Sequence, residues 1–182
     1  MRYPAEHKLE TRDLILTEAA KQIRAHGPLG VGVADIMKKA GLTHGGFYAH
    51  FKSKDALVAA AIGKMFESAR TRWEKTAGLG AYIDWYLSAE HRDARETGCP
   101  VVALASDVPR LSKACRTAYA AGARAFVERI SSVVGDDVTA SSIVAELVGA
   151  LALARVEPDP GRSDQLLAAS RRALRERIGV TS

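Results

Sequence analysis

Gly41-Leu42-Thr43-His44-Gly45-Gly46-Phe47-Tyr48-Ala49-His50-Phe51-Lys52-Ser53 is the stretch that decides the fold of this chain. Gly41 follows an apolar helical pattern and can adopt the left-handed conformation that ends a helix. Thr43 can then cap the next helix by accepting a hydrogen bond from a free backbone N–H. Phe47 and Phe51 recur at i and i+4 as its single buried stripe. The stretch therefore predicts a tight turn followed by a short polar helix that neighbouring segments must support.

Two adjacent glycines, Gly45 and Gly46, stand in the first turn of this short helix. Each lowers helix stability by about 1 kcal/mol relative to alanine, so local propensity disfavours them there. One interpretation is that a partner approaches the backbone so closely that a side chain would block it. The other interpretation is a loose turn, and the glycines alone do not decide between the two.

The flanking segments supply the support. Upstream, apolar residues from Ile15 to Ile23 line one face of a helix that ends at His26, before Gly27-Pro28. Downstream, Ser53 is a good cap for a long amphipathic helix that runs to Trp73. Two helices, a three-residue turn with glycine, a short helix and a long connector are typical of a helix-turn-helix DNA reader.

The segment from Ile15 to Leu57 resembles the TetR family of bacterial repressors. The resemblance is carried by Ile36-Met37-Lys38-Lys39-Ala40-Gly41-Leu42, by Phe47-Tyr48-Ala49-His50-Phe51 and by Lys52-Ser53-Lys54-Asp55-Ala56-Leu57. It implies an all-α fold of about nine helices, with a three-helix DNA-binding domain over residues 1–54 and a helical ligand-binding and dimerisation domain over 55–182. It also implies that a dimer binds a palindromic operator in double-stranded DNA and that a small molecule, hydrophobic or aromatic, releases it.

The resemblance assigns DNA contacts by position. Residues matching the usual phosphate contacts are Tyr48, His50, Lys52 and Lys54, and those at the base-reading start of the recognition helix are Thr43, His44, Gly45 and Gly46. Thr43 and His44 are the side chains expected to read bases, although a hydroxyl and an imidazole can contact several of them. One departure is Gly32-Val33-Ala34, where many relatives have Thr or Ser followed by Arg, so only backbone amides are expected to contact a phosphate there.

The charge distribution agrees with a DNA-binding amino-terminal third. Residues 1–54 contain nine Lys or Arg against five acidic residues, whereas the whole chain has a net charge of only +5. A basic surface attracts the phosphate backbone, although many basic residues are merely solvated. The excess matters because it coincides with the helix-turn-helix pattern.

Seven of the eleven aromatic residues fall between residues 66 and 126, which favours an apolar ligand pocket in the central segments. For any single one of them, an ordinary helical core is the better explanation. The residues expected to bind ligand are Met65, Phe66, Trp73, Tyr82, Trp85, Tyr86, Cys99, Val102, Leu111 and Tyr119. Glu90, His91 and Arg116 are candidate polar groups.

Cys99 precedes Pro100 at an expected helix start. A thiol in that position can have a lowered pKa and sense oxidants or electrophiles, which gives an alternative repressor mechanism. The competing interpretation is a buried small apolar residue, which is common for a free cysteine.

The last two expected helices favour a dimer interface. The helix around Ile143–Ala154 is apolar nearly all round, so both of its sides must be covered. A four-helix bundle with a second copy would supply the two-fold axis of a palindromic operator. The interface residues expected are Val144, Leu147, Val148, Leu151, Leu167 and Leu174.

Other classes of protein find little support. No H-E-x-x-H, phosphate-binding loop or dinucleotide fingerprint occurs, so neither an enzyme nor a cofactor or metal site is expected. The start of the chain lacks an apolar signal region and no uninterrupted apolar run reaches about 18 residues, so we expect a cytoplasmic protein without a membrane partner. A ligand-independent DNA-binding protein is the remaining alternative.

Overall fold

The computed structural model describes the backbone of residues 3–179 and the side chains of residues 6–179. Residues 1–2 and 180–182, which are the outer ends of the expected domain ranges, lie outside the described residues. Arg2, one of the nine basic residues of the amino-terminal third, is among these outer residues. The described residues form nine α-helices and two 3-10 helices, with no strands, which confirms the all-α prediction. In order they are α1 (Tyr3–His26), α2 (Val33–Lys39), η1 (His44–Ala49), α3 (Lys54–Glu74), α4 (Gly78–Tyr86), α5 (Ala89–Asp93), α6 (Pro100–Leu104), η2 (Val108–Arg110), α7 (Lys113–Val134), α8 (Asp137–Val156) and α9 (Pro160–Arg177).

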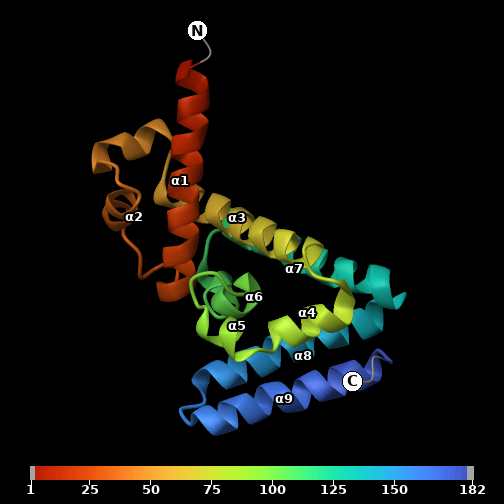
Figure 1. Ribbon diagram of the computed structural model, residues 1–182. Helices are drawn as coiled ribbons and strands as arrows, with labels where there is room; N and C mark the ends of the chain where they lie inside the picture. Colours follow the sequence, from red (N-terminus) through yellow and green to blue (C-terminus); the bar gives the residue numbers. More distant parts are fainter. Residues whose placement is uncertain (1–2, 180–182) are drawn as a thin grey trace.

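The helices form two groups joined by α3. Figure 1 shows α1 and α2 at one end of the molecule, with α3 running away from them beside α7. The helices α7, α8 and α9 pack in sequence, and α4, α5 and α6 fill the space between α3 and α8. The long α3 therefore connects the amino-terminal group to the central helices.

The apolar stripe predicted for α1 is the core of the amino-terminal group. Ile15, Ala19 and Ile23 are fully buried, and they pack with residues of α2, η1 and the first half of α3. The same cluster continues to Cys115 on α7. No apolar gap therefore separates the amino-terminal group from the central helices at residue 54, and the division into 1–54 and 55–182 stays a prediction.

The turn after α2 forms as predicted. Gly41 has φ of +71°, and Leu42 N–H donates to the carbonyl of Met37 at 2.8 Å, which is the six-residue hydrogen bond of a Schellman ending. The next element differs from the prediction, because η1 is a 3-10 helix and the Thr43 side chain makes no capping bond. Six residues with two glycines are too short for a regular α-helix to compete with the tighter turn.

The helix α7 begins after a short 3-10 turn. Pro109 lies in η2, and α7 begins at Lys113, where the Ser112 hydroxyl accepts from Cys115 N–H at 3.3 Å. Further along α7, a Cβ on Gly122 would overlap the Phe66 ring of α3. Glycine thus permits the close crossing of α3 and α7 that brings their side chains to one pocket.

The helix α8 is long and apolar enough to cross a membrane by length and composition alone. It packs between α7 and α9, and one face carries fully buried residues, among them Ile143, Leu147 and Leu151. These contacts are those of a core helix.

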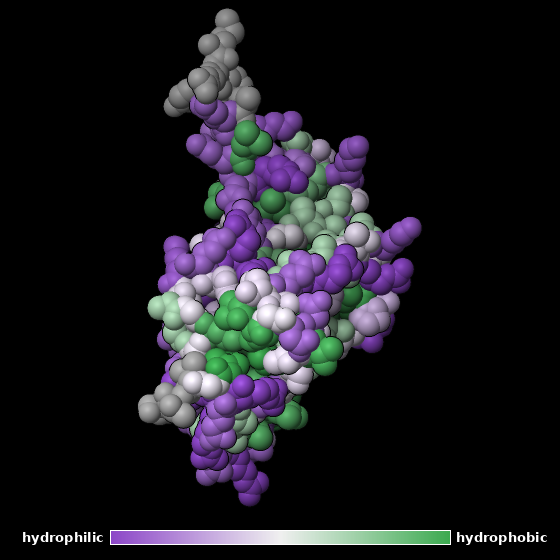
Figure 2. All heavy atoms as spheres, turned by 90° about the vertical axis from the view of Figure 1, so that its right-hand side faces the viewer, coloured by the Kyte–Doolittle hydropathy of each residue, from purple (hydrophilic) through white to green (hydrophobic). Residues whose placement is uncertain are grey.

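On the face seen in Figure 2, hydrophobic atoms gather below α1, whereas the exposed surface of α1 itself is mostly hydrophilic.

Candidate nucleic-acid interface and central pocket

The expected DNA contacts share one surface at η1 and the start of α3. The exposed residues there are Thr43, His44, Gly45, Tyr48, Lys52 and Lys54, and the half-buried ones are Gly46 and His50. Tyr48 is 71% exposed, which is unusual for a large aromatic side chain. The rings of Phe47 and Phe51 are buried beneath, 5.8 Å apart between centroids and nearly parallel, so these residues hold η1 on the core as predicted.

Nothing within the chain requires glycine at positions 45 and 46. Neither has a positive φ, and a Cβ on Gly45 would meet no atom within 4 Å. A Cβ on Gly46 would make only ordinary contacts, at 3.8 Å from Met37 Cε. The backbone at Gly45 is therefore open to solvent on the exposed side of the turn.

The electrostatics of this surface favour an anionic partner. Among the described residues, neither Lys52 nor Lys54 forms a salt bridge, and the guanidinium of Arg12 lies 4.9 Å from the centroid of the Phe51 ring. Partial burial and the nearby cations Lys8 and Arg12 lower the pKa of His50. His50 is therefore neutral at pH 7 and offers a ring N–H rather than a charge.

The amino-terminal geometry agrees with the comparisons. Residues 15–61 match the sequence profile described as bacterial regulatory proteins of the tetR family. A TetR transcriptional regulator from Chloroflexus aurantiacus has a crystal structure that superposes with a TM-score of 0.81 at 27% identity, covering 96% of each chain. The chain belongs to the TetR family. Its helix-turn-helix is accordingly that of a DNA-binding transcriptional regulator.

A curated relative within the TetR family is the HTH-type transcriptional repressor NemR of Escherichia coli, 27% identical over 131 residues. That match covers 67% of this chain and 66% of NemR, so it spans just under two thirds of the relative. The crystal structure of reduced E. coli NemR superposes with a TM-score of 0.80 at 22% identity and covers 92% of this chain and 97% of that one. This structural likeness shows the shared fold.

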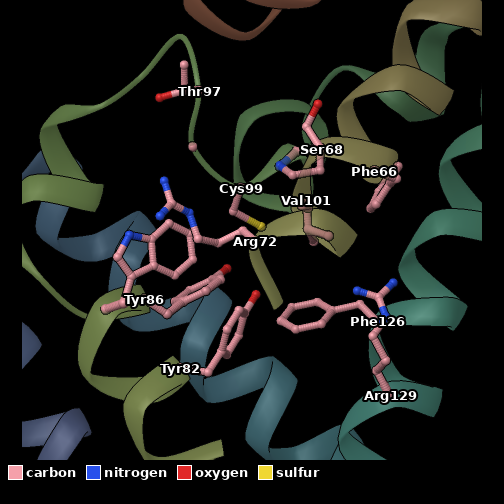
Figure 3. A pocket seen from close by; sticks show the side chains of 14 residues that line it. Phe66, Ser68, Arg72, Tyr82, Tyr86, Thr97, Cys99, Val101, Phe126 and Arg129 are labelled. Carbon is pink, nitrogen blue, oxygen red and sulfur yellow. The ribbon is translucent and has the colours of Figure 1, made fainter. Parts of the chain in front are cut away.

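A pocket of about 180 Å³ lies between α3, α4, α7 and the segment before α6 (Figure 3). Five of the predicted ligand residues line it, namely Phe66, Tyr82, Trp85, Tyr86 and Cys99. The rings of Tyr82, Trp85, Tyr86 and Phe126 form a continuous network, in which Tyr82 lies 6.1 Å from Phe126 and 5.6 Å from Trp85 between centroids. A pocket lined by aromatic side chains therefore lies in the central segments, where the sequence predicts one.

The other five predicted ligand residues do not line this pocket. Met65 and Leu111 pack in the amino-terminal core, Trp73 packs edge-on to Tyr82, and Val102 packs against the carboxyl-terminal core. Tyr119 donates a hydrogen bond to the Val101 carbonyl at 3.2 Å, behind the pocket wall. For these residues the alternative interpretation of an ordinary helical core is correct.

Nine pocket residues escaped the sequence-based prediction, namely Ser68, Ala69, Arg72, Thr97, Gly98, Pro100, Val101, Phe126 and Arg129. Phe126 belonged to the central aromatic group and could have been chosen on that ground. Arg72 and Arg129 could not, because an arginine on an amphipathic helix normally marks its solvated face. Of the candidate polar groups, Glu90 and Arg116 are exposed away from the pocket.

His91 is buried behind the pocket and holds its wall in place. Its Nδ1 donates to the Tyr86 carbonyl at 2.7 Å, and its Nε2 accepts from Cys99 N–H at 3.0 Å. The ring stacks on Trp85 with 4.3 Å between centroids. Burial lowers the pKa of His91 to about 4, so it is neutral at pH 7. The two hydrogen bonds therefore fix the backbone at Cys99.

Cys99 itself is 7% exposed, and burial raises the pKa of its thiol. The thiol therefore lacks the lowered pKa that an oxidant sensor would need, because burial outweighs the opposing effects of the Tyr86 hydroxyl and Arg155. Cys99 matches the alternative interpretation of a buried small residue, here in the wall of the pocket.

The predicted dimer interface needs correction. Four of its six residues, Leu147, Leu151, Leu167 and Leu174, are at most 3% exposed and pack within this chain's own carboxyl-terminal core. Only Val144 and Val148 remain partly accessible. The stripe identified in the sequence is the face of α8 that meets α7 and α9. The opposite face carries Leu153 and Val156, which are 57% and 77% exposed.

Proposed function

We propose that this chain is a transcriptional repressor that binds a palindromic operator as a homodimer and is released by a small hydrophobic or aromatic effector. The observation that carries the DNA-binding part is the surface at η1, where polar side chains and an unobstructed glycine backbone stand over a buried pair of phenylalanines. In this proposal Thr43 and His44 contact bases, while Tyr48, His50, Lys52 and Lys54 contact phosphates.

The glycine pair has a specific role in the proposal. Because Gly45 has no positive φ and a Cβ there would meet no atom of the described residues within 4 Å, its lack of a side chain serves no purpose within this part of the chain. A backbone that must approach a phosphate or a base edge closely does require it. Of the two interpretations that the sequence left open, we therefore favour contact with DNA.

The proposed release of DNA by an effector is supported by the position of α3. Its first half, with Leu57 and Ala61, belongs to the core beneath the DNA-binding surface, and its second half supplies Phe66 and Arg72 to the pocket. A ligand that moves the second half would also displace the first, since both lie on one continuous helix. The Cys99 thiol serves here as part of the pocket wall.

The dimer would form through the outer face of α8 and α9. Leu153, Val156 and Leu166 are large apolar side chains that this chain leaves exposed there. Burying them against a second copy would remove apolar surface from water and would set two helix-turn-helix units about a two-fold axis. We further propose residues 1–54 and 55–182 as the DNA-binding and regulatory domains, and a cytoplasmic location.

Selection of binding sites from a random duplex library, followed by fluorescence anisotropy, tests the proposal. We expect an inverted repeat whose half-sites are about one helical turn apart, or a multiple of it. Lys52→Ala should weaken binding to every sequence. It should also reduce the slope of log affinity against log salt concentration by about one, as expected for the loss of one phosphate contact. His44→Ala should instead relax the preference at one base pair of each half-site.

Recovery of no consensus, or a His44→Ala variant with unchanged base preference, would contradict the assigned surface. Lys75→Ala provides a matched control, because Lys75 is an exposed lysine at the far end of α3. That variant should bind operator DNA with the wild-type affinity and salt dependence.

A further inference from the structure

The charge in the pocket is of one sign. Arg72 from α3 and Arg129 from α7 line it, and no acidic residue does. Among the described residues neither arginine forms a salt bridge with a carboxylate, whereas the neighbouring Arg70 pairs with Glu74. The Arg72 guanidinium lies over the indole of Trp85, 5.0 Å from the ring centroid. In the described part of the chain the pocket therefore presents two guanidinium groups without a carboxylate in salt-bridge contact, although Glu74 and Glu128 act on Arg129 from a greater distance.

The position of Arg129 strengthens this point. It is half-buried, and desolvation lowers its pKa from the ordinary value. Removing a guanidinium from water without pairing it is unfavourable, so an anion in the pocket would gain more from Arg129 than from a solvated surface arginine.

A buried hydroxyl in the same wall also lacks a strong partner. Tyr86 is 1% exposed, and in the described part of the chain its Oη has no nitrogen or oxygen partner and interacts only with the Cys99 thiol, which is a weak acceptor. Figure 3 shows the hydroxyls of Tyr82 and Tyr86 directed towards the interior of the pocket. Burial raises the pKa of both phenols, so each stays protonated and can donate. A buried donor with only a weak acceptor is costly, and a ligand that accepts from it removes that cost.

The size of the pocket limits the apolar part of its ligand. Its volume of about 180 Å³ is slightly larger than the apolar cavity of about 150 Å³ that accommodates benzene in another protein. Phe66, Tyr82, Trp85 and Phe126 surround it with ring faces and edges. A single aromatic ring with a short substituent fits this space.

We propose that the pocket binds a monocyclic aromatic carboxylate, whose ring lies among the aromatic side chains and whose carboxylate accepts from the Tyr86 hydroxyl in the positive field of Arg72 and Arg129, which flank the pocket from two sides. This inference rests on the proposed function, since it names the chemical class of the effector.

Calorimetric titration with benzoate and phenylacetate, each against its neutral amide, tests the inference. The acid should bind at least about tenfold more tightly than the amide, because only the acid carries a negative charge that the guanidinium groups attract. Arg72→Gln and Arg129→Gln should each reduce this preference, and the double variant should abolish it while keeping affinity for the amide. Retained amide binding shows that the pocket is still folded.

Two further variants sharpen the result. Arg116→Gln removes an arginine of α7 that is exposed away from the pocket, so the preference for the acid should stay unchanged. Tyr86→Phe should weaken binding of the acid about tenfold without altering the pocket's shape. Equal affinities of acid and amide, an unchanged preference in the double arginine variant, or no binding of either acid would each overturn the inference.

Failure of the inference can be distinguished from failure of the proposed function by adding each compound to the complex with selected operator DNA. If the amides bind as tightly as the acids and release the DNA, the anionic class is wrong and the pocket remains the effector site. If benzoate binds with the arginine-dependent preference but leaves the DNA complex intact, the ligand class is supported and effector-controlled release is wrong.

Discussion

The guanidinium of Arg24 donates a hydrogen bond of 3.0 Å from Nη2 to the main-chain carbonyl of Met65. This contact joins the end of α1 to the middle of α3. Nη1 of the same side chain donates to the carbonyl of Glu96 at 3.4 Å, in the segment that leads to the pocket wall at Gly98 and Cys99. One buried side chain thus bridges the helix-turn-helix core, the connecting helix and the pocket.

Replacing Arg24 by methionine should weaken the connection between these three parts. The variant keeps a long side chain but loses both hydrogen bonds, so we expect the free energy of unfolding to fall by about 2 kcal/mol. Hydrogen exchange should become faster in residues 94–98. Urea denaturation and exchange mass spectrometry measure the two effects. Arg116→Met, at an exposed position on α7, is the control, and equal stability of the two variants would show that the bridge contributes nothing.

Alanine at Gly45 should affect DNA binding and stability in opposite directions. Because a Cβ there meets no atom of the chain, stability should stay unchanged or rise by up to about 1 kcal/mol. Affinity for operator DNA should fall about tenfold, since the methyl group lies where the DNA backbone approaches. Gly63→Ala is the matched control, because Gly63 is equally unobstructed but lies within α3. Equal DNA affinities of the two variants would favour the loose-turn interpretation instead.

The helix-turn-helix could be predicted from the sequence because its determinants are local. The spacing of Phe47 and Phe51 shows which side of η1 is buried, Gly41 ends α2, and the Ser53 hydroxyl accepts from Ala56 N–H at 3.1 Å as a helix cap. Such signals act within one or two turns of chain. The 3-10 geometry of η1 could not be predicted in this way. Helix propensities describe α-helices, and over six residues their sum is too small to decide between the two kinds of helix.

The pocket and the interface depend on packing between distant segments, which local patterns do not encode. Arg72 and Arg129 are far apart in the sequence and line one pocket only because α3 crosses α7 closely at Gly122. Similarly, α8 is apolar on both faces, so the sequence shows that both are covered but not which one meets α9. Leu147 and Leu151 were therefore assigned to a partner although they pack within the chain.

The neutral state of His91 should make stability depend on pH. In the folded chain burial lowers its pKa to about 4, whereas in the unfolded chain it is about 6.5. As pH falls through this window the unfolded chain binds a proton first, so stability is lost, by about 3 kcal/mol in total. Protonation would also place an N–H against Cys99 N–H. Urea midpoints between pH 7 and 4 should therefore fall more steeply in the wild type than in His91→Gln; parallel curves would contradict this.

Glutamate at Leu153 should produce a folded monomer. The side chain is 57% exposed in this chain, so a charge there leaves the core intact, but it would be buried between α8 helices in the proposed dimer. Light scattering after gel filtration should show a dimer for the wild type and a monomer for Leu153→Glu, with the same helical circular dichroism. Val133→Glu, at the similarly exposed end of α7, should remain dimeric. Because one copy contacts only one half-site, the monomer should bind a palindromic duplex about a hundredfold more weakly, whereas its affinity for a single half-site should equal that of the wild type. A Leu153→Glu variant that is still dimeric would place the interface elsewhere.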